Sequence, residues 1–165
     1  MTDISFTIPA VPIAQPRPRA TIRKFGDGKL SARVYNKETH PVAAFKATCR
    51  IAASSAYHGP PLQGPLVVRL LFVMPRPKSM LWKKKPMPVV EHTVKPDIDN
   101  LTKALFDALN GVAWVDDSQV WSKQVDKVIA SGYESPCVQV RIRERTLEQA
   151  AAEVVRDSTG HTIGS

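Results

Sequence analysis

The nine-residue run LVVRLLFVM, Leu66–Met74, constrains the fold more than any other part of the 165-residue chain. It is rich in Val, Leu and Phe, and a proline stands on each side of it. Because a membrane span needs roughly 18 to 20 apolar residues, this short run predicts a strand buried on both faces of a sheet. The N-terminus also lacks a basic segment followed by an apolar one, so we expect a cytoplasmic protein with no membrane contact.

Alternating and helical apolar patterns surround this strand. Residues 4–8 and 138–142 alternate apolar with polar side chains, which predicts half-buried strands, and apolar residues spaced three or four apart predict helices. The expected strands are 4–8, 66–74, 119–130 and 137–143, the last two separated by a turn; the expected helices are 39–57, capped by Thr39, then 97–110 and 146–157. This order predicts one α+β domain, residues 1–157, with a small mixed, mostly antiparallel sheet and packed helices, and a flexible tail at 158–165.

Two proline-rich segments carry much of the positive charge. Residues 10–36 contain a GDGK turn between two short basic patterns, which predicts an exposed hairpin. Residues 75–95 form a long loop insertion with Trp82 beside three lysines, and loops of this length are either functional or disordered. Residues 1–90 carry a net charge of +12 and residues 91–165 carry −4. A nucleic acid partner is therefore expected, with a merely basic surface as the alternative.

The two cysteines, Cys49 and Cys137, occur without a CxxC pattern. We expect two buried free thiols rather than a disulfide or a structural zinc site. The four histidines are scattered along the chain, and none is predicted to be catalytic.

Acidic residues gather around the helical segment 97–110, in the stretch KPDIDNLTKALFDALNGVAWVDDSQV, residues 95–120. They are Asp97 and Asp99 before the helix, Asp107 within it, and Asp116 and Asp117 after it. A structural role is one explanation: Asp97 or Asp99 caps the helix, and Lys103 pairs with the acids one turn away on either side.

A metal site is the other explanation. Asp97 and Asp99 lie two apart in an extended segment, where alternate side chains point the same way. The strand after the helix is expected to run back towards the helix N-terminus. The pair Asp116–Asp117 would then come within reach of Asp97 and Asp99. Converging carboxylates need a cation such as Mg²⁺, and with Lys103 near a scissile phosphate such a site would hydrolyse phosphodiesters.

Residues 95–120 resemble the signature of the RusA family of Holliday-junction resolvases: D-x-D-N-L-x-K at the helix start, D-A-L-N at its end and D-D-x-Q-V opening the next strand. IPAVPIAQPRPRAT and RVYN are similar to the family's opening segment. The resemblance implies a RusA-like α+β endodeoxyribonuclease that works as a homodimer on branched DNA and cuts two strands of a four-way junction symmetrically. It implies Mg²⁺ as cofactor, with Mn²⁺ as a substitute, and a bacterial or phage-infected cell as the setting. The long loop 75–95 departs from compact members of the family.

The resemblance also implies roles for individual residues. The catalytic residues would be Asp97, Asp99, Lys103 and Asp117; the metal ligands Asp97, Asp99, Asp116 and Asp117; the supporting residues Asn100, Asp107 and Gln119. From charge, we expect DNA phosphate contacts from Arg17, Arg19, Arg23, Arg33, Lys83, Lys84 and Lys85. Trp82 would stack on an unpaired base, or else the loop is solvated and partly disordered.

Two other functions fit the same residues. A non-catalytic DNA-binding module of this fold would use the acids as caps and salt-bridge partners. Another Mg²⁺ nuclease, directed at flaps or single strands, would use the same acids on a different DNA.

Overall fold

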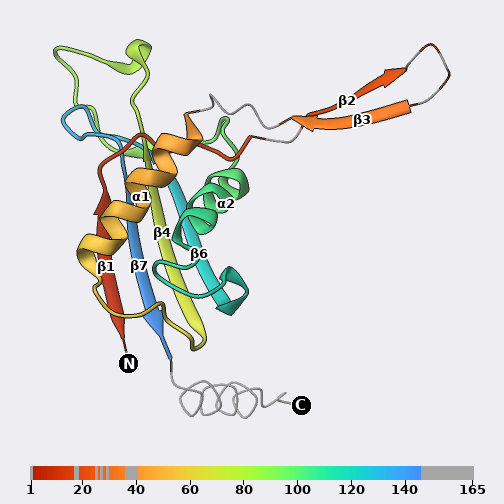
Figure 1. The fold of residues 1–165 in the computed structure, drawn as a ribbon. Coiled ribbons are helices and arrows are strands. Elements are labelled where there is room, and N and C mark those ends of the chain that lie inside the picture. Colours follow the sequence, from red (N-terminus) through yellow and green to blue (C-terminus); the bar gives the residue numbers. More distant parts are fainter. Residues whose placement is uncertain are drawn as a thin grey trace, which may run out of the picture.

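The computed structural model describes residues 2–16, 19–24, 26, 28, 30–35 and 41–145, and for 19–24 and 30–35 the backbone alone. The fold is α+β, as the sequence predicts: in the described part of the chain, two helices pack on one face of a five-stranded mixed sheet (Figure 1). The expected terminal helix and tail lie outside the described residues, as does Thr39. No helix in the described ranges is long and apolar enough to cross a bilayer.

The main sheet has the strand order β1-β7-β4-β6-β5. Its strands are β1 (Asp3–Ile8), β4 (Leu66–Met74), β5 (Val90–Glu91), β6 (Val120–Ile129) and β7 (Cys137–Glu144). The helices are α1 (Val42–Ala56) and α2 (Ile98–Leu109), with the short 3₁₀ turns η1 (Lys78–Met80) and η2 (Asp117–Gln119). Neighbouring strands are antiparallel except β4 and β6, which run parallel.

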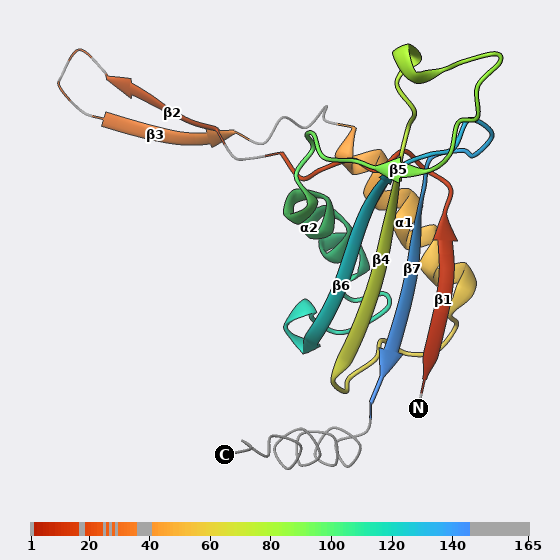
Figure 2. The same ribbon diagram turned by 180° about the vertical axis from the view of Figure 1, so that it is seen from behind.

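The central strand β4 has the bounds that the sequence predicts, but it is not buried on both faces. Leu66, Val68, Leu70 and Phe72 are buried under the helices, whereas Arg69 between them is exposed. The reason is that both helices cover the same face of the sheet, and the view from behind shows the strands in front of the helices (Figure 2). The expectation of two covered faces was therefore wrong for most of the strand, although Val73, near its end and on the same face as Arg69, is buried.

The basic hairpin is confirmed for the backbone that the structure describes. β2 (Arg19–Lys24) and β3 (Leu30–Tyr35) form a separate antiparallel pair that projects from the main sheet (Figure 1), and Gly28 in its turn has a positive φ of 79°. The strands expected at 119–130 and 137–143 are also present as β6 and β7. They are not neighbours, however, because β4 lies between them.

The parallel pairing of β4 and β6 dictates where α2 lies. Parallel neighbours need a crossover connection, and a crossover helix runs antiparallel to both strands as it packs on the sheet. The buried side of α2 presents the predicted stripe, Leu101, Leu105 and Ala108 among others. The helix ends at Leu109, two residues before Gly111, which has a positive φ of 74°. The N-terminus of α2 therefore lies at the end of the sheet where β4 and β6 finish, and its C-terminus lies where they begin.

Helix α1 buries the predicted stripe Val42, Phe45, Cys49 and Ala53 against the same core. Cys49 is a buried free thiol, as expected. Cys137 is also free, but it is only partly buried because it opens the strand β7 at the edge of the core.

Candidate active site

Asp97 and Asp99 stand at the N-terminus of α2. Asp97 occupies the N-cap position in an extended conformation, with φ −70° and ψ 143°, yet within the described chain its side chain makes no capping hydrogen bond. Its carboxylate instead accepts a long hydrogen bond of 3.5 Å from Asn100 Nδ2. Asp99 lies in the first helical turn rather than in the extended segment, and its exposed carboxylate benefits from the positive end of the helix dipole. The prediction that the Asp97 side chain caps the helix is thus wrong.

An open pocket of about 740 Å³ lies beside Asp97, between the segment 92–98 and β6. Lys127 fixes this segment, because its Nζ donates hydrogen bonds of 2.7 Å to the Val94 carbonyl and 2.6 Å to the Pro96 carbonyl. His92 lines the same pocket, and burial together with the Lys127 charge lowers its pKa. The sequence gives no signal for His92 or Lys127 here, because the two meet only through the pairing of β5 with β6: His92 follows β5, and Lys127 lies in β6.

Asp116 and Asp117 open the η2 turn that leads into β6. Asp116 caps this turn: its Oδ1 accepts from the Ser118 amide at 2.8 Å, and its own amide donates to Gln119 Oε1 at 2.9 Å. The hydrogen bond from Ser118 lowers the pKa of the Asp116 carboxyl below its usual range. Gln119 Nε2 in turn donates to two carbonyls of the segment 62–64, each at 3.0 Å. Gln119 thus holds the turn that opens β6.

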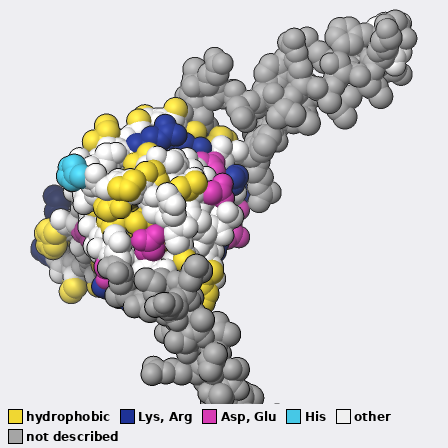
Figure 3. Space-filling model, turned by 60° about the horizontal axis from the view of Figure 1, so that its bottom comes forward, with side chains coloured by type: hydrophobic (Ala, Val, Ile, Leu, Met, Phe, Trp, Pro, Cys, Tyr) yellow, Lys and Arg dark blue, Asp and Glu magenta, His cyan; other side chains and the backbone are white. Residues whose placement is uncertain are grey.

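The two acidic pairs lie at opposite ends of α2 in one chain. The 12-residue helix is about 18 Å long. Asp97 lines a pocket together with Asp126, which lies six residues after Val120 in β6. Asp116 and Asp117, by contrast, come just before Val120, where β6 begins. Figure 3 shows the end where β6 begins, with acidic side chains among apolar and basic ones. Within the described residues, no group of three or more His, Cys, Asp or Glu side chains is placed to hold a metal ion.

The separation has a local cause in the turn after α2. Trp114 folds back beside the helix end, fully buried, and its Nε1 donates to Asn110 Oδ1 at 2.6 Å. Its ring also meets Phe106 edge-on with centroids 5.2 Å apart. The residues that were expected to carry the second acidic pair towards the helix N-terminus instead pack at the helix C-terminus, and only the strand that follows them runs back.

Lys103 and Asp107 follow the structural explanation more closely. Lys103 Nζ lies 3.3 Å from the Asp107 carboxylate, which also pairs with Lys46 of α1 at 3.2 Å. Asp107 therefore ties the two helices together. The Lys103 side chain stays 63% exposed one turn after Asp99, so its ammonium remains accessible to an anion.

The predicted DNA contacts are only partly visible. Arg17 and the side chains of Arg19, Arg23 and Arg33 lie outside the described residues, whereas Lys83, Lys84 and Lys85 are exposed in the loop after β4. The Gln15 amide donates to the Asn100 carbonyl at 2.9 Å. The segment 10–16, which precedes the basic hairpin and is called the hairpin stem below, is thus attached at Gln15 to the first turn of α2, beside Asp97 and Asp99.

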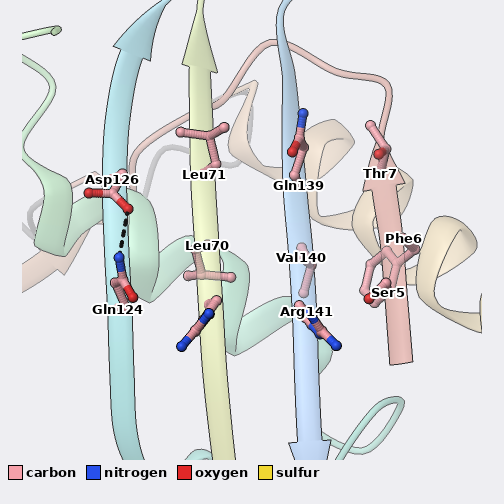
Figure 4. A pocket seen from close by; sticks show the side chains of 11 residues that line it. Ser5, Phe6, Thr7, Leu70, Leu71, Gln124, Asp126, Gln139, Val140 and Arg141 are labelled. Carbon is pink, nitrogen blue, oxygen red and sulfur yellow. Dashed lines mark hydrogen bonds between the residues drawn. The ribbon is translucent and has the colours of Figure 1, made fainter. Parts of the chain in front are cut away.

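A second pocket, of about 450 Å³, lies on the open face of the sheet (Figure 4). Arg141 there makes a two-pronged ion pair with Asp3, with hydrogen bonds of 3.0 and 2.7 Å, and this pair lowers the pKa of Asp3. None of the motif residues lines this pocket. The candidate site is therefore the α2 N-terminus and not the open sheet face.

The fold and the motif are those of a nuclease-type α+β domain, in which a D-x-D pair stands at the start of a crossover helix and Lys95 and Lys127 line the pocket beside it. Comparison with known proteins identifies the class: the family described as Endodeoxyribonuclease RusA matches residues 9–143. The chain is also 36% identical over 149 residues to the uncharacterised protein YqaN of Bacillus subtilis strain 168, covering 87% of this chain and 98% of YqaN. The chain belongs to the RusA endodeoxyribonuclease family. Membership indicates a hydrolase that cuts DNA, in a family that acts on branched junctions and generally uses divalent metals.

Proposed function

We propose that the protein is a Mg²⁺-dependent, structure-selective endodeoxyribonuclease that resolves Holliday junctions by symmetric hydrolysis of two phosphodiesters. The observation that carries the proposal is the place of the D-x-D pair in a chain of the RusA endodeoxyribonuclease family. Asp97 and Asp99 stand exposed at the N-terminus of α2, and Asp97 lines an open pocket there.

The donor set at the α2 N-terminus suits Mg²⁺, and Mn²⁺ as a substitute. Mg²⁺ in phosphoryl-transfer sites is usually bound by one or two carboxylates, with waters and substrate phosphate oxygens as its other ligands. Asp97 and Asp99 supply such carboxylates. When bound, the ion activates a water and stabilises the leaving oxygen. Lys103, exposed one turn further on, neutralises charge that develops on the phosphate.

The positioning residues of the site follow from the contacts. Lys127 holds the segment before α2 through two carbonyls, and Asn100 contacts Asp97 while its own carbonyl anchors the hairpin stem. Asp97 is thus presented by fixed backbone rather than by a free loop. Such fixed presentation lowers the cost of orienting the scissile phosphate.

A homodimer completes the proposal. A four-way junction offers two equivalent phosphates, and a two-fold interface gives one site to each. Because one chain holds Asp116 and Asp117 a helix length away from Asp97, a second copy is one way to unite the two pairs. Mixing Asp97→Asn with Asp117→Asn protein tests this: regained cleavage in the mixture means that each site takes acids from both chains, and no gain means that it does not.

Asp97→Asn is the direct test of catalysis, with Asp126→Asn as the matched control. Asp126 lines the same pocket, carries the same charge and lies outside the signature. We expect Asp97→Asn to lower Mg²⁺-dependent junction cleavage by about 100-fold or more and to keep or tighten junction binding, since an acid facing phosphate is removed. Asp126→Asn should cleave normally.

The substrates decide between the functions. Synthetic four-way junctions, flaps, linear duplexes and single strands are offered with Mg²⁺ or with EDTA. Symmetric nicks confined to the junction support a resolvase, and cuts spread along single strands favour the other nuclease. Unchanged cleavage by Asp97→Asn contradicts the proposed site, and junction binding without any cleavage by the unmodified protein favours a non-catalytic module.

A further inference from the structure

The loop between β4 and β5, residues 75–89, is held in a defined path at one end of the sheet (Figure 2). Arg76 organises it. Its Nε donates to the Met80 carbonyl at 2.9 Å, and its Nη1 donates to the carbonyls of Pro88 and Ala130 at 2.8 and 3.1 Å. One guanidinium thus links the start of the loop, its end and the end of β6.

Other features restrain the same loop. Four prolines, at positions 75, 77, 86 and 88, fix φ in their residues. Met87 accepts a hydrogen bond at its carbonyl from the Gly132 amide at 3.0 Å, and its sulfur accepts from the Trp82 amide at 3.3 Å. The loop therefore loses little conformational entropy on binding a ligand.

Trp82 lies where this restrained loop meets solvent. Its side chain is 40% exposed, and the preceding Leu81 is 52% exposed. The Arg76 Cζ lies 5.4 Å and the Lys85 Nζ 5.8 Å from the ring centroid, both in cation–π range. Arg76 is fixed by its three carbonyl partners, whereas Lys85 is an exposed side chain that can move to a phosphate. Lys83 and Lys84, which follow Trp82 directly in the chain, are exposed as well.

The loop and Asp97 belong to the same end of the molecule. The loop runs directly into β5, which pairs with the last residues of β6, and the His92 amide then donates to the Lys127 carbonyl at 3.0 Å. From Val90, where the loop ends, seven further steps along the chain reach Asp97, a distance of at most about 23 Å. The loop that carries Trp82 and the pocket at Asp97 therefore lie at the same end of the sheet, where one DNA junction can contact both.

We propose that Trp82 is a stacking platform for an unpaired base at a DNA branch point, and that Lys83 to Lys85 bind the adjoining phosphates. An exposed indole backed by cations is the arrangement that stacks nucleobases in single-strand binding proteins. Bases within a continuous duplex already stack on each other, whereas a branch point offers a base at low unstacking cost. The loop then selects branched DNA over linear DNA, which deepens the proposed function and rests on it for the identity of the substrate.

Binding in EDTA tests the platform without any cleavage. A synthetic four-way junction carries 2-aminopurine at the branch point, and a linear duplex carries it at the matching position. We expect the unmodified protein to quench 2-aminopurine in the junction. Trp82→Leu should lose the quenching and bind the junction about 5- to 150-fold more weakly, the range of one base stack, with duplex affinity unchanged.

The chain offers a matched control in Trp121. It is 55% exposed and has Arg145 Cζ at 5.3 Å from its ring, but it lies at the beginning of β6, away from the loop. Trp121→Leu should quench and bind as the unmodified protein does. Trp82→Phe, which keeps an aromatic face, should retain most of the junction preference.

Two outcomes overturn the inference. Junction affinity unchanged in Trp82→Leu means that no base stacks on Trp82, and equal losses in Trp82→Leu and Trp82→Phe mean that the indole only closes the loop. Because no metal is present, the readout is separate from catalysis. A protein that fails to cut junctions with Mg²⁺ yet binds them through Trp82 contradicts the proposed function alone.

Discussion

Gln119→Met is expected to loosen the turn that carries Asp116 and Asp117. The side chain of Gln119 makes three hydrogen bonds, two donated to carbonyls of the segment 62–64 and one accepted from the Asp116 amide. Methionine has a similar length and shape but makes none of them. The variant therefore removes the hydrogen bonds while changing the packing little.

The structure sets the size of the effect. A typical hydrogen bond contributes about 0.5 to 1.5 kcal/mol net, and Asp116 is exposed, so water satisfies its amide after the change. The other two bonds reach partly buried carbonyls. We expect a loss of about 2 to 3 kcal/mol in the free energy of unfolding, or about 4 to 12 °C in Tm for a chain of this size.

Urea unfolding followed by circular dichroism measures this loss, with Gln124→Met as the control. Gln124 is an exposed glutamine on β6 whose side chain donates a long hydrogen bond of 3.4 Å to Asp126, so its replacement should cost less than about 0.5 kcal/mol. A Gln119→Met protein as stable as the control would refute the view that this side chain holds the turn.

Two further outcomes follow from the contacts. Asp107→Asn should lower the free energy of unfolding, measured in urea, by about 0.5 to 1 kcal/mol, because its two lysine pairs are partly screened by solvent. Junction cleavage should stay within a few-fold of normal. Abolished cleavage in a stable variant would instead make Asp107 catalytic. Burial raises the pKa of the Cys49 thiol to about 12, so this thiol stays protonated at pH 8. A disulfide reagent should therefore label Cys137 alone until denaturant is added. Immediate labelling of both thiols in the native protein would contradict the burial of Cys49.

Local patterns in the sequence are strong enough to predict most elements of the main sheet and both described helices. A segment buries its apolar side chains only if its backbone has the same period as the apolar pattern. Two patterns that predict an element in this way are the run Leu66–Met74 and the stripe of Leu101, Leu105 and Ala108. The exposed Arg69 in the middle of β4 is a sign, in hindsight, that one face of the strand is open. The type and approximate bounds of a helix or strand depend on residues close together in the chain, so they can be predicted from the sequence.

Strand pairing is different, because the partner of a strand is chosen by distant residues. The parallel alignment of β4 with β6, nine residues of each pairing in nearly continuous register, has no local signature. It alone decides that α2 runs against both strands and so has Asp97 at one end and Asp116 at the other. The candidate site could be assigned to residues from the sequence motif, but the arrangement of those residues in space could not.

The same topology explains why a basic chain keeps its acids where it does. Asp107 is paired with two lysines, and Asp116 accepts a hydrogen bond from a backbone amide as a cap, so the negative charge of each carboxylate is stabilised locally. Asp97 and Asp99 lie instead at the end of the sheet where Gln15, before the basic hairpin, contacts Asn100 and where Lys127 holds the segment before α2. Negative charge in such surroundings repels the phosphate that the lysines attract, and a divalent cation between them removes that repulsion. We therefore expect junction affinity to rise with Mg²⁺ or Ca²⁺ in the unmodified protein and to lose this metal dependence in Asp97→Asn, because the variant no longer needs the cation to accept phosphate.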